Sequence, residues 1–167
     1  MRRAGWRGTL GGVALLATAV CATPAWVPDH GLLWHPLEAV AVPDLSATGW
    51  ERVAVEDADL AFTKHGIGVL AARLRCPAPA EGTPLRWEGR QLWLGVPRDR
   101  IERFHFDVDG HEGVSMAARS DGLYLRTATV RTRSCSLDVV QVAPEGVGAD
   151  LVFESFMARV RLHRGEP

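Results

Sequence analysis

Four polar residues near the middle of the chain have a spacing that could bind a metal ion. They are His105, Asp107, Asp109 and His111. In a β-strand, alternate side chains share one face, with successive members about 7 Å apart. That distance is too wide for one divalent ion unless the chain turns at Asp109-Gly110 and brings neighbouring members together. The alternative interpretation is a solvated strand face that ends in a hairpin.

Cysteine chemistry is a second candidate. Cys76 and Cys135 are the two cysteines that follow Cys21 in the chain. In an oxidising compartment such a pair predicts one disulfide, which would close a loop of about 60 residues and stabilise the fold by about 4 kcal/mol. Two free, buried thiols are the alternative. A nucleophile formed by Cys135 with His105 or His163 would need a base within reach, and no neighbouring sequence supports one.

Arginines offer a third kind of site. Arg131 and Arg133 share a strand face by period two and could bind a carboxylate or phosphate, whereas Arg126 falls on the opposite face. Sequence patterns for a serine hydrolase, a zinc peptidase and a phosphate-binding loop are all absent. We therefore expect a protein that is not an enzyme and needs no cofactor.

The N-terminus has the pattern of an export signal over residues 1–20. Arg2, Arg3 and Arg7 precede an uncharged, apolar run over residues 10–20, which is too short to span a bilayer. The run continues directly into Cys21, which predicts a lipoprotein anchored through that cysteine to the outer membrane of a bacterial envelope. The alternative is a cleaved, soluble periplasmic protein.

Composition indicates one globular domain. The chain has 167 residues, 47% of them apolar, with 19 basic and 20 acidic side chains. This balance argues against disorder and against nucleic acid as a partner. We expect a Pro-rich tether or arm over residues 21–49, a single domain over 50–162 and a tail over 163–167. Four large apolar residues in the arm could pack on the domain or dock a partner; they are Trp26, Leu32, Leu33 and Trp34.

The domain must contain both strands and helices. Strands are expected over 59–64, 67–76, 123–132 and 135–142, and period-two alternation begins at Ile101. Thr83-Pro84 predicts a helix over about 84–94. An apolar stripe led by Phe153 and Phe156 predicts another over about 149–161. The predicted class is α+β, with a single, largely antiparallel sheet of five or six strands and two covering helices.

This order of elements resembles the Mog1/PsbP-like fold of small exported lipoproteins. The resemblance rests on the element order, on Trp50, on the Asp59-Leu60-Ala61-Phe62 strand and on the Phe-rich final helix. It implies a non-enzymatic accessory or interaction module with a protein partner in the envelope. The alternative function is a periplasmic protein that binds a small ligand or divalent metal.

Overall fold

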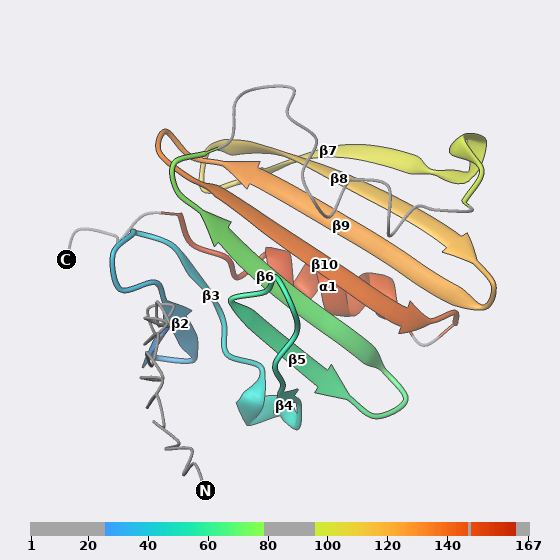
Figure 1. Cartoon of the computed structure of the whole chain (residues 1–167), viewed down its shortest axis with the longest axis horizontal. Coiled ribbons are helices and arrows are strands. Elements are labelled where there is room, and N and C mark those ends of the chain that lie inside the picture. The colour runs from blue at the N-terminus through green and yellow to red at the C-terminus, as the bar shows by residue number, and fades with distance from the viewer. Residues whose placement is uncertain (1–25, 79–95, 147, 163–167) are drawn as a thin grey trace, which may run out of the picture.

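The structure is a computed structural model that describes residues 26–78, 96–146 and 148–162 (Figure 1). These residues form two antiparallel sheets and one α-helix. The small sheet comprises β1 (Val27–Asp29), β2 (Leu32–Trp34) and β3 (Ala41–Pro43). The large sheet comprises β4 (Glu51–Arg52), β5 (Leu60–Lys64), β6 (Gly68–Arg75), β7 (Glu102–Val108), β8 (His111–Ser120), β9 (Leu123–Arg131) and β10 (Ser136–Pro144). The helix is α1 (Ala149–Met157), and η1 (Ser46–Thr48) and η2 (Arg98–Arg100) are single 3₁₀ turns.

The large sheet has the strand order β4-β5-β6-β10-β9-β8-β7, and each neighbouring pair is antiparallel. Tight turns create its longest hairpins. Asp109-Gly110 joins β7 to β8 and Asp121-Gly122 joins β8 to β9, and all four residues have positive φ. Asp-Gly pairs adopt this conformation readily, and its twist matches that of the flanking strands. The turn expected at Asp109-Gly110 is therefore present.

The predicted fold class is wrong. The described chain is mostly β, with ten strands in two sheets and one α-helix, rather than a single sheet with two covering helices. The three strands of the small sheet are each three residues long, which is too short to produce a readable alternation. The helix expected over 84–94 lies outside the described residues.

The predicted C-terminal helix exists but is shorter than expected. It ends at Met157 instead of continuing to residue 161. Val160 and Leu162 remain buried beyond the helix, and Arg161 exchanges two backbone hydrogen bonds with Ala41 at 2.8 and 2.9 Å. Pairing with β3 therefore replaces the last helical turn, and helix periodicity alone does not reveal this tertiary contact.

The core lies between one face of the large sheet and a layer made of α1 and the small sheet. Figure 1 shows α1 lying across the large sheet near β10 and β6. The core includes Phe62, Leu70 and Leu137 from the sheet and Phe153 and Phe156 from α1. The segment expected as a tether or arm contributes, from Trp26 onward, five more buried side chains: Trp26, Leu33, Val40, Val42 and Leu45.

No helix within the described ranges is both long enough and apolar enough to cross a membrane.

Candidate functional site

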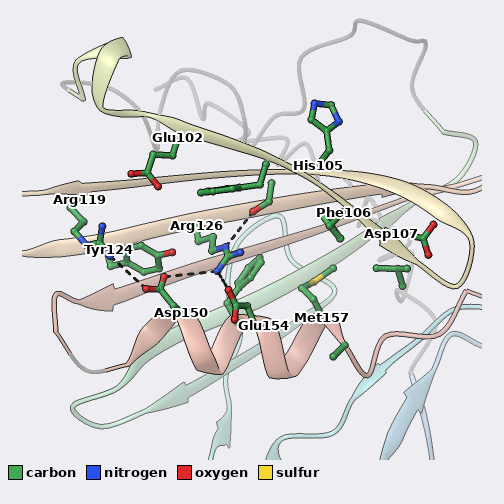
Figure 2. A pocket seen from close by; sticks show the side chains of 15 residues that line it. Glu102, His105, Phe106, Asp107, Arg119, Tyr124, Arg126, Asp150, Glu154 and Met157 are labelled. Atoms are coloured by element: carbon green, nitrogen blue, oxygen red, sulfur yellow. Dashed lines mark hydrogen bonds and ion pairs between the residues drawn. The ribbon is translucent and has the colours of Figure 1, made fainter.

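A cavity of about 530 Å³ lies between β7 and α1 (Figure 2). Its wall is built from β7, β8, β9 and the side of α1 that faces the sheet, and it mixes aromatic, aliphatic and charged side chains. The residues are Glu102, Phe104, His105, Phe106, Asp107, Val108, Ser115, Arg119, Tyr124, Arg126, Asp150, Phe153, Glu154, Met157 and Ala158. We refer to this cavity as the β7–α1 pocket.

The pocket exists because α1 does not cover the β7 end of the sheet. The Phe104 side chain, which points to the pocket side of β7, is 42% exposed. Phe106 pairs across the strands with Gly113, and a Cβ atom at Gly113 would lie only 2.5 Å from the Phe106 ring. The glycine thus lets the ring lie against the backbone of β8, which keeps this part of the cavity open.

Arg126 is the central charge of the pocket. Its side chain is 13% exposed, and its guanidinium carbon lies 4.8 Å from the ring centre of Phe153 and 5.8 Å from that of Phe104. Nε donates to Ser115 Oγ at 3.3 Å, and Nη1 lies 3.2 Å from Glu154 Oε1. Packing between two rings and pairing with a carboxylate fix the guanidinium in place.

Asp150 links this arginine to a second one. Its carboxylate lies 3.9 Å from Arg126 Nη1 and 3.5 Å from Arg119 Nη2. Arg119 also lies 3.7 Å from Glu145. Asp150 is in the first turn of α1, where the helix dipole favours a negative charge. Asp150 and Glu154 are four residues apart on one face of α1, so the helix presents both carboxylates to the same sheet face.

Tyr124 is buried beside this network. The guanidinium of Arg119 lies 5.2 Å from the centre of its ring. Burial, together with a hydrogen bond to the Asp150 carboxylate, raises the pKa of Tyr124 to about 12. The nearby Arg126 opposes this shift only in part. The phenol therefore remains neutral at physiological pH and acts as a hydrogen-bonding group.

The four residues predicted to bind metal do not converge. Figure 2 shows His105 on the side of β7 that faces away from α1, where its Nδ1 lies 3.1 Å from Glu112 Oε1. Asp107 Oδ1 accepts a hydrogen bond from the Gly110 amide. Asp109 Oδ2 accepts one from the Leu162 amide. The two carboxylates thus accept backbone hydrogen bonds in the turn and in the segment after α1. Together with His105 and His111 they do not form a metal site among the described residues.

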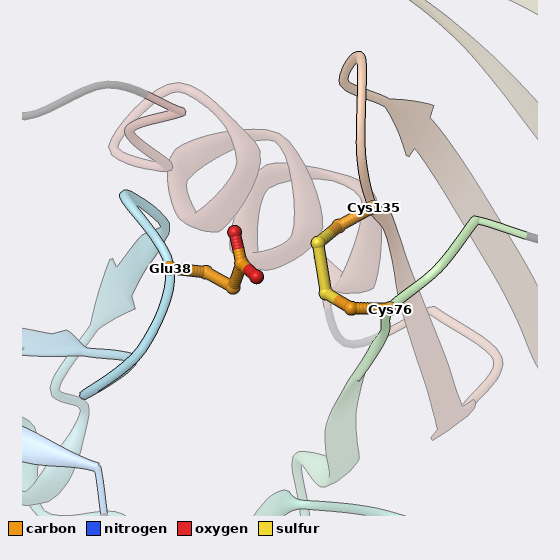
Figure 3. Close-up of side chains that lie close together, drawn as sticks. All are labelled: Glu38, Cys76 and Cys135. Carbon is orange, nitrogen blue, oxygen red and sulfur yellow. A yellow bond between two sulfur atoms is a disulfide. The ribbon is translucent and has the colours of Figure 1, made fainter.

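Within the described part of the chain, one group brings together three residues whose side chains can bind a metal ion. Glu38, Cys76 and Cys135 place their ligand atoms within 4.8 Å of one another (Figure 3). The two cysteines are joined by a disulfide, which links the end of β6 to the segment before β10. Sulfur atoms in a disulfide are not thiolates and do not bind a metal ion as thiolates do. The two cysteines therefore form a covalent link between the strands rather than part of a metal centre.

The arginines singled out from the sequence lie away from the pocket. Arg131 ends β9, and Arg133 is exposed in the turn that follows it. The pocket instead uses Arg126, which occupies the opposite strand face. Sequence reasoning missed the apolar neighbours of Arg126 on its strand face. Arg126 shares that face with Tyr124, Ala128 and Val130, all of which are buried.

A buried ion pair occupies the other face of the sheet. Arg75 Nε donates to Asp138 Oδ2 at 2.8 Å, and the Thr129 hydroxyl donates to Asp138 Oδ1 at 2.9 Å. Burial raises the pKa of Asp138, and Arg75 opposes the shift. Ser136 donates a further hydrogen bond. These partners connect β6, β9 and β10, so we assign this cluster a structural role.

Comparison with known proteins gives similarity to solved structures alone. No family model matches the chain, and no curated protein matches it. The solution structure of cyanobacterial PsbP (CyanoP) from Synechocystis is similar at a TM-score of 0.49 and 14% identity, over 93% of this chain and 100% of that one. A crystal structure from Bacteroides thetaiotaomicron is similar at a TM-score of 0.47 and 11% identity, over 76% of this chain and 46% of that one. The function proposed below rests on the residues of the β7–α1 pocket.

Proposed function

We propose that this chain is an exported, non-enzymatic accessory module of the bacterial cell envelope that binds a partner protein in the β7–α1 pocket. The observation that carries the proposal is the pocket itself. Its cavity of about 530 Å³ combines an exposed aromatic ring, Phe104, with a fixed network of charges around Arg126. Aromatic and arginine side chains are the residues that most often anchor protein interfaces.

The chemistry of the pocket favours binding over catalysis. The Tyr124 phenol has a pKa of about 12, so it is a poor nucleophile and a poor acid near neutral pH. The Ser115 hydroxyl oxygen accepts a hydrogen bond from Arg126, a cation that cannot serve as a general base. Both guanidinium groups contact carboxylates instead of pointing freely into the cavity. These groups are arranged to recognise a ligand.

The proposed location rests on the N-terminal sequence. Residues 1–20 have the composition of an export signal, and Cys21 follows its apolar run directly. We place the mature chain in the periplasm, anchored to the outer membrane by a lipid on Cys21. The disulfide between Cys76 and Cys135 supports an oxidising compartment.

Site-specific photo-crosslinking in cells tests the pocket as a docking site. A photoreactive amino acid replaces Phe104 in the full-length protein, and the matched control replaces Leu151, which is 71% exposed on the outer side of α1. We expect a discrete protein adduct from position 104 that position 151 does not give. The same adducts from both positions, or none from position 104, would contradict the proposal.

Labelled palmitate tests the anchor separately. We expect incorporation into the wild-type chain and none into Cys21→Ala. An unlabelled wild-type chain recovered from the periplasm would establish the soluble alternative.

A hydrolase panel tests the absence of enzymatic activity. Esterase, phosphatase and peptidase substrates should remain intact in the presence of the purified protein. Turnover that Ser115→Ala abolishes would show that the pocket is an active site.

A further inference from the structure

We propose that the partner contributes an extended, positively charged segment, which pairs with the outer edge of β7 and inserts basic and aromatic side chains into the pocket. This inference rests on the proposed function and adds the chemistry of the occupant. It follows from two features of the described residues, namely the charges that line the pocket and the position of β7 at the end of the sheet.

The arginines of the pocket are already neutralised. Arg119 contacts Glu145 and Asp150, and Arg126 contacts Asp150 and Glu154. An anionic ligand would have to displace these carboxylates and would lose the ion pairs that hold both arginines.

A cationic side chain finds partners in the same place. Asp150 and Glu154 remain about half exposed beside their arginines, so each can accept another hydrogen bond. Glu102 lines the pocket from β7, and no ion pair joins it to another described residue. The partly exposed ring of Phe104 offers an aromatic surface near these carboxylates. The pocket therefore complements a positive charge that is carried next to an apolar or aromatic group.

The position of β7 determines the form of the ligand. β7 is an edge strand of the large sheet, and no described strand pairs with its outer edge. It contains no proline, so the alternate amides between Glu102 and Val108 that point away from β8 can all take part in a ladder. A segment paired there would place every second side chain, about 7 Å apart, on the face that carries Phe104.

Synthetic peptides test the inference on the purified mature protein. The probe alternates Arg and Tyr on one face with Thr on the other. One control replaces Arg by Glu, and another N-methylates the amides that would face β7. Fluorescence anisotropy measures binding at low salt. The first control loses the ion pairs and the second loses the backbone ladder. We therefore expect the basic peptide to bind at least about tenfold tighter than either control, a difference of about 1.4 kcal/mol in binding free energy. Equal or tighter binding of the acidic peptide, or no binding of the basic one, would overturn the inference.

Variants locate the binding on the protein. Glu102→Gln should weaken the basic peptide several-fold, whereas the matched control Glu56→Gln, on an exposed loop, should leave its affinity unchanged. Equal effects of the two variants would mean that only overall charge matters, which overturns the inference. An adduct from position 104 that maps to an acidic partner segment would overturn this inference but leave the proposed function intact. Absence of that adduct would remove the proposed function as well.

Discussion

The two ends of the large sheet expose the same kind of strand face to different surroundings. At the β5-β6-β10 end, α1 and the small sheet cover the face, and Phe62 is 1% exposed. At the β7-β8 end the helix does not extend far enough, and Phe104 is 42% exposed beside paired charges. Apolar alternation therefore builds a core where a covering layer is present and leaves a partly exposed aromatic surface where that layer stops.

The largest expected contrast comes from truncating one phenylalanine at each end. Phe62→Ala should lower the free energy of unfolding by about 3–5 kcal/mol, because it leaves a cavity in the core. Phe104→Ala should cost about 1–2 kcal/mol, because the ring is 42% exposed and only part of its apolar surface is removed from water. Urea denaturation measures both changes. Similar losses for the two variants would show that the β7 end belongs to the core.

Removal of the disulfide should separate stability from binding. The double variant Cys76→Ser/Cys135→Ser should lose about 4 kcal/mol of unfolding free energy, since the bond closes a sequence separation of 59 residues. Affinity for the basic peptide should stay within about twofold wherever the variant is folded, because the bond links β6 to β10 rather than the strands of the pocket. A matching loss of affinity would contradict the independence of the two ends.

The β7 end contains Tyr124, the only tyrosine of the chain, so phenolate absorbance reports on it alone. We expect a titration midpoint near pH 12, and a shift back toward 10 in Asp150→Asn. Between pH 10 and 12 an unfolded phenol ionises while the folded one stays neutral. The free energy of unfolding should therefore fall as pH rises through that window. A midpoint near 10 in the folded wild type would contradict the buried network around Asp150.

The smallest expected effect lies at the covered end. Gln141 is 0% exposed, and its amide nitrogen and oxygen have no hydrogen-bond partner among the described residues. Gln141→Leu should raise the free energy of unfolding by about 1–2 kcal/mol, because it removes the desolvation cost of an unpaired amide. Thermal denaturation measures the change. A destabilised variant would show that the Gln141 amide is hydrogen-bonded in solution, which would contradict its isolation from water at this end of the sheet.

The strands of the large sheet could largely be predicted from the sequence. Alternation and Asp-Gly turns are local signals, and they locate β7 to β10 to within a few residues. The small sheet could not be predicted, because its strands are shorter than two periods and depend on packing. The end of α1 depends on the backbone pairing of Arg161 with Ala41, a contact between distant parts of the chain.

The site was less predictable than the sheet. The spacing of His105, Asp107 and Asp109 follows one strand into the turn at Asp109-Gly110, but it does not determine where the polar atoms point. The pocket depends on Arg126 meeting Glu154 from a helix that lies 28 residues further along the chain. A charged residue on an otherwise buried strand face is the sequence signal that would have identified it.

Chemical-shift mapping of the basic peptide on ¹⁵N-labelled protein tests the central claim most directly. The account predicts that shift changes concentrate in β7, in the neighbouring part of β8 and in the first turns of α1, while β5 and β6 stay unchanged. Changes centred on the covered end, or spread evenly over the sheet, would contradict it.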